Sequence, residues 1–264
     1  MKGWLVYDAL GAQRNEWYIS RLQAEAEKYG LALVLKIVEK GDLTALFEGN
    51  LPDFAIVRTI CPKINARLEA LGVRTFNNAK TAELACDKYK TYLACKAWNI
   101  PVLLTWRAGE RTEFPCVMKR TDGHGGTEVF WIENQAEIED NTQTDGEYIF
   151  QKPNKILGKD MRVYVVGGEI AGAVLRSSTS GFKSNFSLGG SVQSAEVDKE
   201  QKAIVARLYK ELAFDYVGID FLPTEEGWVL NEIEDSAGAR MLYQCTDVDI
   251  AALFIRHVYK QLSR

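Results

Sequence analysis

Three carboxylates lie within two short apolar runs toward the C-terminal end of the chain. Asp220 interrupts the run at 217–222, and Glu232 and Glu234 end the second run. The turn-forming segment 223–227 separates the runs, which predicts a β-hairpin. Strand side chains alternate between faces, so Glu232 and Glu234 point the same way. Three acids on one face repel unless a positive charge lies between them, and oxygen ligands favour a hard divalent cation such as Mg²⁺.

A solvated acidic face is the alternative to a metal site. It suits Glu225 and Glu226, which lie in the predicted turn. It suits Asp220 poorly, because apolar residues flank Asp220 on both sides. We therefore predict a cation site formed by Asp220, Glu232 and Glu234.

A lysine followed by a glycine-rich segment is the second group of residues whose types suit the binding of a ligand. Lys119 ends an apolar run, and three of the four residues at 123–126 are glycine. Backbone N–H groups at Gly125 and Gly126 can approach a polyphosphate closely, and Lys119 supplies a positive charge. The spacing fits neither the P-loop nor the dinucleotide fingerprint. A flexible hairpin loop explains the glycines equally well.

Two arginines occupy strands that are otherwise apolar. Arg162 and Arg176 lie in the two arms of a predicted hairpin that turns at Gly167 and Gly168. These arginines can bind an anionic ligand, or they can form ion pairs within the fold.

The composition excludes several classes of function. The chain has 264 residues, 47% hydrophobic and 26% charged, which is ordinary for a globular protein. A net charge of −4 and a pI of about 5.5 give no overall positive field, so we expect neither nucleic acid nor membrane as a partner. Five cysteines without a C-x-x-C pair indicate reduced thiols and a cytoplasmic location. Two distant histidines, His124 and His257, disfavour a zinc site or a hydrolytic triad.

Strand and helix patterns alternate in the first third of the chain. The predicted strands are 3–8, 31–38, 54–58 and 73–76, and the predicted helices are 15–29, 43–49 and 66–71. This alternation predicts a parallel sheet that binds ligands beyond the carboxyl ends of its strands. Asp8 and Arg58 end strands there, and each can be either a ligand-binding residue or a helix-flanking surface charge.

The remainder of the chain predicts a mixed α+β arrangement. A single helix is predicted over 81–99. The strands predicted after it are 102–106, 115–119, 127–132 and 148–151, with a helix near 135–139. Further helices are predicted over 199–212 and at the C-terminal end, where His257 flanks an apolar stripe as a structural residue.

Taken together, these segments resemble the ATP-grasp superfamily, specifically the RimK-type carboxylate–amine ligases, over roughly 81–262. Four blocks in family order carry the resemblance: Asp87-Lys88, Met118-Lys119 with its glycine segment, 158–162 with Lys183-Ser184-Asn185, and Asp220 with Glu232-x-Glu234. The resemblance implies an α/β protein, with α+β structure in the ATP-grasp lobes. It implies an N-terminal parallel-sheet pre-ATP-grasp domain at 1–78, a central lobe at 79–147 and a C-terminal lobe with the metal site at 148–264.

The resemblance also implies a role for each matched residue. The residues expected to contact ATP are Lys88, Lys119, Gly125, Gly126, Gln151, Lys152, Pro153, Asp160, Lys183 and Asn185. The residues expected to hold Mg²⁺, with Mn²⁺ as the alternative, are Asp220, Glu232 and Glu234. Glu234 stands where the family usually has asparagine, and Lys152 where it usually has glutamate. Arg162, Arg176 and Arg240 are expected to hold a carboxylate or the transferring phosphoryl group.

The implied activity is ATP-dependent joining of a carboxylate to an amine through an acyl phosphate, on an amino acid or small peptide. The alternatives are an ATP-grasp kinase of small molecules and a nucleotide-binding module without turnover. The expected partners are small-molecule carboxylate and amine substrates. Their identity is left open, as is assembly into a homo-oligomer. Specificity is expected in the N-terminal domain and in loops near Arg58, 178–186 and 240–245.

Overall fold

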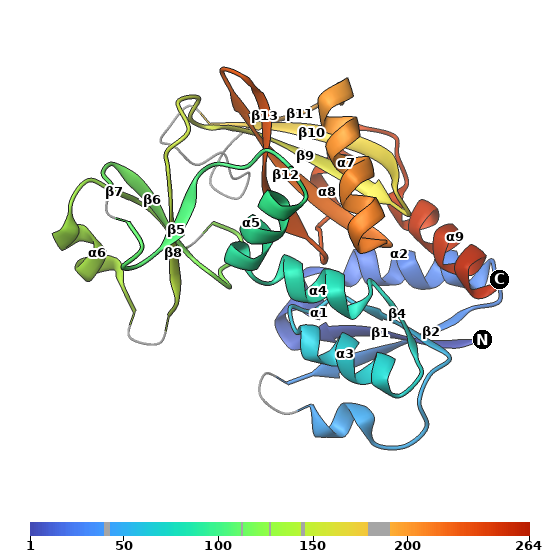
Figure 1. Ribbon diagram of the computed structural model, residues 1–264. Coiled ribbons are helices and arrows are strands. Elements are labelled where there is room, and N and C mark those ends of the chain that lie inside the picture. Colours follow the sequence, from blue (N-terminus) through green and yellow to red (C-terminus); the bar gives the residue numbers. More distant parts are fainter. Residues whose placement is uncertain (40–42, 112, 127, 144–145, 179–190) are drawn as a thin grey trace.

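The part of the chain that the structure describes contains three β-sheets with helices packed beside them. The computed structural model describes residues 1–39, 43–111, 113–126, 128–143, 146–178 and 191–264. Within these residues the strand orders are β2-β1-β3-β4 in the N-terminal sheet, β5-β8-β6-β7 in the central sheet and β11-β10-β9-β12-β13 in the C-terminal sheet. Figure 1 shows the N-terminal sheet below, the central sheet at the left and the C-terminal sheet above.

The N-terminal sheet is parallel, as predicted. Its strands are β1 (Lys2–Asp8), β2 (Ala32–Val38), β3 (Phe54–Val57) and β4 (Arg74–Phe76). Its helices are α1 (Ala9–Arg14), α2 (Glu16–Glu27) and α3 (Pro62–Ala70), with a 3-10 turn η1 (Thr44–Phe47). Helix α1 was not predicted, and it forms because Asp8 accepts a hydrogen bond from the Gly11 N–H at 2.8 Å and caps the helix. Asp8 therefore flanks a helix, one of the two roles expected for it.

The single helix predicted over 81–99 is wrong. The structure has two helices instead, α4 (Ala79–Ala85) and α5 (Lys88–Ala97). The Asp87 side chain accepts hydrogen bonds from the N–H groups of Tyr89 and Lys90, both at 2.9 Å, and so starts a new helix. A local bond between side chain and backbone competes here with a continuous helix. The break places Lys88 in the first turn of α5, where its N–H donates to the Thr121 carbonyl at 3.0 Å.

The central sheet is antiparallel and has its own small core. Its strands are β5 (Thr105–Arg107), β6 (Cys116–Arg120), β7 (Val129–Ile132) and β8 (Tyr148–Gln151), with helix α6 (Gln135–Asn141) beside them. Strand β8 pairs with both β5 and β6, so Tyr148–Gln151 belongs to this sheet. The buried side chains of this core are Trp106, Cys116, Met118, Ile132 and Phe150.

The C-terminal sheet is antiparallel and consists mainly of the two predicted hairpins. Its strands are β9 (Lys159–Val166), β10 (Glu169–Ser177), β11 (Ser191–Ser194), β12 (Tyr216–Thr224) and β13 (Gly227–Glu234). The accompanying helices are α7 (Lys199–Leu212), α8 (Arg240–Cys245) and α9 (Ile250–Leu262). The expectation of a loop at 240–245 is wrong. Met241 and Leu242 are buried, and the Thr246 hydroxyl closes helix α8 by donating to the Leu242 carbonyl at 2.8 Å.

A shared core joins the N-terminal and C-terminal sheets. Leu5 and Phe54 of the N-terminal sheet belong to the same buried cluster as Tyr216 and Phe254, whose ring centroids are 5.3 Å apart. His257 lies beside this cluster, with Nε2 2.7 Å from Asp215 Oδ1, which agrees with a structural role. These two parts of the chain therefore form one packed body, while the core of the central sheet is separate.

The β9–β10 turn packs tightly. Gly167 and Gly168 have φ values of +57° and +87°, which glycine adopts without strain. A Cβ atom on Gly167 would lie 2.4 Å from His257 Nδ1. Glycine is required at this position by both backbone conformation and space.

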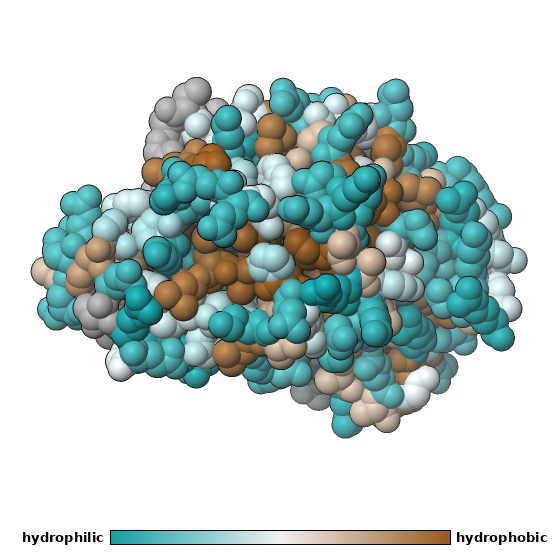
Figure 2. All heavy atoms as spheres, turned by 45° about the horizontal axis from the view of Figure 1, so that its top comes forward, coloured by the Kyte–Doolittle hydropathy of each residue, from teal (hydrophilic) through white to brown (hydrophobic). Residues whose placement is uncertain are grey.

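The surface is mixed rather than uniformly apolar. Figure 2 shows apolar side chains gathered in a band across the middle of one face, with hydrophilic side chains around it. In the described ranges of the chain, none of the helices is both long and apolar enough to cross a membrane.

Candidate functional site

A cavity of about 370 Å³ opens between the central and C-terminal sheets, and it brings most of the predicted site residues together. The predicted residues that line it are Lys119, Gly125, Gly126, Gln151, Lys152, Asp160, Arg162, Arg176, Asp220, Glu232, Glu234 and Arg240. Pro153 follows Lys152 but is not part of the lining, and Lys88 lies just outside it. Lys183 and Asn185 fall outside the described residues.

A β-bulge shapes the acidic side of the cavity. Asp220 pairs with Glu232, whereas Phe221 pairs with Leu230, so Asn231 is an extra residue in β13. A bulge breaks strict alternation, and here Asn231 and Glu232 both line the cavity although they are adjacent. Asn231 was missed by the sequence analysis, and its signal was a polar residue inside an apolar run.

The three predicted carboxylates converge. One oxygen from each of Asp220, Glu232 and Glu234 lies within 4.8 Å of the others. Oxygen donors at this spacing fit a hard divalent cation such as Mg²⁺. The cluster can therefore hold a cation at the edge of the cavity.

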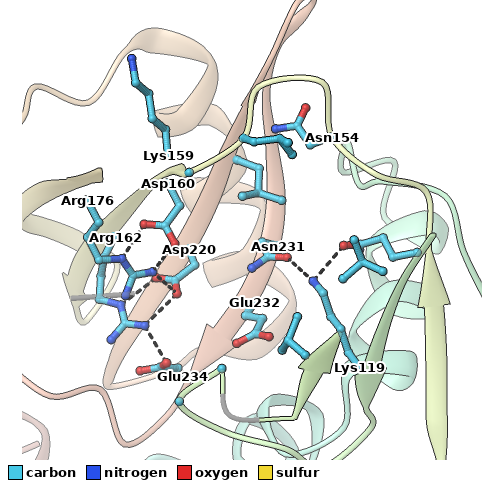
Figure 3. Close-up of a pocket in the computed structure, with 18 of the residues that line it drawn as sticks. Lys119, Asn154, Lys159, Asp160, Arg162, Arg176, Asp220, Asn231, Glu232 and Glu234 are labelled. Carbon is cyan, nitrogen blue, oxygen red and sulfur yellow. Dashed lines mark hydrogen bonds and ion pairs between the residues drawn. The ribbon is translucent and has the colours of Figure 1, made fainter. Parts of the chain in front are cut away.

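Arg162 forms ion pairs with two of these acids (Figure 3). It lies directly across from Asp220 in the β9–β12 pairing. Its Nε and Nη2 atoms donate to the two oxygens of Asp220 at 2.7 Å each, and Nη2 also donates to Glu234 at 2.6 Å. Ion pairing within the fold, one of the two roles expected for Arg162, is thus present.

Arg176 completes the charge network. Its Nε and Nη2 atoms donate to Asp160 at 2.5 and 2.7 Å, and Nη2 also donates to Asp220 at 2.7 Å. Burial alone would raise the pKa of Asp220, but the charges of Arg162 and Arg176 outweigh it and hold that pKa below its usual value. Asp220 is therefore ionised over the whole physiological range.

Lys119 is a buried cation with neutral partners. Its ammonium group on β6 donates to Gln151 Oε1 at 2.8 Å and to Asn231 Oδ1 at 2.9 Å. Burial lowers the pKa of Lys119 to about 8, although the nearby charge of Glu232 opposes the shift. The site thus holds a lysine whose charge is only weakly compensated and can serve an anionic ligand.

Lys88 connects the glycine segment to the acids. Its ammonium group donates to the Gly123 carbonyl and lies 3.5 Å from a Glu232 oxygen. Gly125 and Gly126 have φ values of +69° and +73°, a conformation that residues with side chains rarely adopt. The segment therefore depends on glycine for its backbone path along the cavity.

The rest of the lining includes a set of apolar side chains and one residue of the N-terminal domain. The apolar side chains include Leu103, Val117, Val129, Ile156, Leu157 and Leu222. They suit a planar ring beside Gln151 and Lys152. At the other end lie Asn15 and Arg240, and Arg240 Nη2 donates to the Arg14 carbonyl at 2.6 Å. The cavity thus extends from the central sheet to the N-terminal domain.

Arg58 does not line the cavity. It is also not a surface charge, which was one of the two roles expected for it, because it is buried. It is buried between the rings of Tyr18 and Tyr216, at 5.5 and 5.2 Å from their centroids. Its Nη2 donates to the Ala237 carbonyl at 2.7 Å. Arg58 therefore connects the N-terminal sheet, through this hydrogen bond, to the turn that follows β13.

Comparisons of the sequence point to one family. Residues 107–258 match the RimK-like ATP-grasp domain. An uncharacterized protein of Mycoplasma genitalium is 28% identical over 272 residues, covering 100% of this chain and 94% of that protein. Human N-acetylaspartylglutamate synthase A is 29% identical over 228 residues, which is 76% of this chain but only 58% of the synthase.

Solved structures agree on the fold. A RimK-domain ATP-grasp protein from Sphaerobacter thermophilus superimposes with a TM-score of 0.74 at 19% identity, covering 98% of this chain and 99% of that protein. The ATP-grasp ligase PsnB, in complex with a precursor variant, Mg and ADP, gives a TM-score of 0.69 at 15% identity, covering 99% and 98%. Identities this low establish the architecture alone.

Proposed function

The chain belongs to the RimK-like ATP-grasp family, and we propose from this premise that it is an ATP-dependent ligase that joins a carboxylate to an amine. The observation that carries the proposal is the convergence of Lys119 and three carboxylates on one cavity that continues to Asn15 and Arg240, with Lys88 just outside it beside Glu232. Such a cavity offers one end for a nucleotide and another for a second substrate.

Different groups of described residues would bind the adenine, the phosphates and the ribose of ATP. The apolar part of the cavity beside Gln151 and Lys152 accommodates adenine, with Pro153 continuing that hinge. Lys119, Lys88 and the backbone of Gly125 and Gly126 face the phosphates. Asp160, which is already bound by Arg176, stands near the ribose.

Asp220 and Glu232 would hold Mg²⁺, with Mn²⁺ as the alternative. A bound cation supplies neutralisation of the phosphate charge. Glu234 is the third oxygen donor of the cluster. Lys183 and Asn185, outside the described residues, stay predicted nucleotide contacts.

The chemistry follows from positioning and charge, without a side-chain nucleophile. An oxygen of the substrate carboxylate attacks the γ-phosphorus of ATP, which gives ADP and an acyl phosphate. The amine then attacks the activated carbonyl carbon and loses a proton, and phosphate leaves that carbon as the amide forms. Lys119 and the arginines Arg162 and Arg176 stabilise negative charge near the transferring group, and Arg240 is placed to bind a substrate carboxylate. Closure of the glycine segment keeps water from the acyl phosphate.

We propose an amino acid or a small peptide as the substrate class, because the chain is similar to the human N-acetylaspartylglutamate synthase A. A cytoplasmic location is part of the same proposal and fits the five free cysteines.

A screen of amino acids and dipeptides with Mg-ATP tests the proposal. Ligation gives ADP, free phosphate and an amide, and hydroxylamine converts the acyl phosphate to a hydroxamate that mass spectrometry detects. A stable phosphorylated hydroxyl product without free phosphate would establish a kinase instead. ATP binding without any ADP across the screen would favour a nucleotide-binding module.

A further inference from the structure

The turn at 235–238 connects two parts of the cavity wall. It follows Glu234, the last residue of β13, and leads to Arg240, the first residue of α8. Gly238 of this turn lines the cavity itself, as do Glu234 and Arg240. The position of the turn therefore sets how far the acids lie from the end of the cavity proposed above for the second substrate.

The Ala237 carbonyl, within this turn, accepts two hydrogen bonds from side chains. Arg58 Nη2 donates to it at 2.7 Å, and the Tyr216 hydroxyl donates to it at 3.2 Å. Arg58 directly follows strand β3, so the N-terminal domain supplies the shorter of these two bonds. Ala237 is fully buried, which shields both bonds from water.

Two further side chains bond to the turn on either side of Ala237. Asn77 Nδ2 donates to the Asp235 carbonyl at 3.2 Å. The Tyr164 hydroxyl donates to the Gly238 carbonyl at 3.1 Å. Three carbonyl groups of the turn thus accept bonds from side chains of other elements, and these bonds hold its backbone in one position.

Arg58 differs from the other donors because it is a buried charge. It is only 8% exposed, and none of the described carboxylates lies within ion-pair distance of it. Replacing a buried charge by an apolar side chain of similar volume is often neutral or stabilising. Stability alone therefore does not account for a guanidinium here, whereas a strong, charge-assisted bond to Ala237 does require one.

We propose that Arg58 is a positioning residue for the second substrate. It does not line the cavity, and it acts through the Ala237 carbonyl on the turn that carries Gly238 and leads to Arg240. A misplacement of about 1 Å can cost roughly a hundredfold in rate, so a bond that fixes this turn affects the reaction from outside the cavity. The inference rests on the function proposed above and gives the N-terminal domain a part in binding the second substrate.

Arg58→Met tests the proposal, because it removes the donor and keeps a side chain of similar length. The assay uses the amino acid or dipeptide that gives the fastest phosphate release in the screen described above. For that substrate kcat/KM should fall about tenfold or more, the loss expected for one charge-assisted hydrogen bond. The KM for ATP should stay unchanged, and the Tm should stay the same or rise because a buried charge is lost.

Arg74→Met is the matched control. Arg74 also belongs to the N-terminal sheet, lies 4.8 Å from the centroid of the Phe76 ring and donates to Asp215 at 3.0 and 3.1 Å, but it does not bond to the turn. This variant should lower the Tm, since the buried Asp215 loses a partner, and should leave both KM values unchanged. If Arg58→Met likewise lowers the Tm and leaves the kinetics unchanged, Arg58 only connects the two sheets and the inference is overturned.

Two conservative variants keep the proposal testable if Arg58→Met fails to fold. Tyr216→Phe and Tyr164→Phe each remove one hydroxyl that bonds to the turn and retain the ring. Each should lower kcat/KM for the second substrate by a smaller factor, because a neutral donor is lost. Unchanged kinetics in both variants would show that the bonds to the turn do not matter for the substrate, which also overturns the inference.

Hydrogen-exchange mass spectrometry measures the turn directly and needs no turnover. In Arg58→Met the amides of 236–245 should exchange about tenfold faster than in the wild-type protein, whereas Arg74→Met should leave their rates unchanged. Unchanged exchange in Arg58→Met would overturn the inference and leave the proposed function intact. Faster exchange in a protein that ligates no substrate of the screen would refute the proposed function, and the role in substrate binding with it.

Discussion

Nucleotide affinity should fall at alkaline pH because Lys119 loses its proton there. The pKa of Lys119 is about 8 in the nucleotide-free protein, and a bound polyphosphate raises it by favouring the charged form. With a pKa of 8, the protonated fraction decreases about tenfold between pH 7 and pH 9. The affinity should decrease by the same factor, which corresponds to about 1.4 kcal/mol of binding free energy. The total loss of binding free energy cannot exceed the contribution of a charge-assisted contact, roughly 1.5–3 kcal/mol.

Isothermal titration calorimetry with a non-hydrolysable ATP analogue and Mg²⁺ measures this effect. Titrations at pH 9 in buffers of different ionisation enthalpy should also reveal uptake of roughly 0.5–0.9 proton per bound nucleotide. Lys119→Arg is the matched control, because its guanidinium stays charged and should give a flat profile from pH 7 to 9. Equal affinity of the wild-type protein at both pH values, without proton uptake, would refute the assignment of Lys119 to the phosphates.

The same pKa affects stability in the absence of nucleotide. The folded pKa of about 8 lies below the ordinary value of 10.5. Between these values the unfolded chain binds more protons than the folded protein, so the contribution of Lys119 to stability rises with pH in that window.

Three further predictions concern the acids, a helix start and a turn. Asp220→Asn should abolish Mg²⁺-dependent ADP formation, and activity retained in a coupled assay would show that this carboxylate is not needed. Asp87→Ala removes the cap of α5 and should cost about 1 kcal/mol of unfolding free energy in urea titrations, whereas Asp87→Asn should retain most of it. Gly167→Ala forces a Cβ against His257 and a left-handed backbone, so it should lower stability by about 1–2 kcal/mol or more. An unchanged urea midpoint for Gly167→Ala would contradict the tight turn.

The sequence predicts the layers of this fold well, because its strands carry strong apolar patterns. The alternating N-terminal elements and both hairpins of the C-terminal sheet are confirmed. The errors lie where a single polar side chain redirects the backbone. Asp8 starts α1 and Asp87 divides the helix predicted over 81–99 through short hydrogen bonds that periodicity cannot detect.

The sequence predicts which residues meet at the site better than it predicts how they meet. From the order of the motifs we expect Lys119, Asp220 and Glu232 at one site, and all three line the same cavity. It does not reveal the bulge at Asn231, since a polar residue inside an apolar run does not show that the strand register shifts there. It leaves open the pairing of Arg162, because strand register decides which acid stands opposite an arginine.

The separate core of the central sheet has a mechanical consequence. The N-terminal and C-terminal sheets share one buried cluster, while the five core side chains of the central sheet contact none of it. We therefore expect the cavity to widen by a tilt of the central sheet as a unit, without opening the cluster that the other two sheets share. Native-state hydrogen exchange should then resolve two cooperative units, with the amides of β6 and β8 opening at a lower free energy than those of β9 and β12. A molecule divided in this way can admit and release a large ligand at little cost to its global stability.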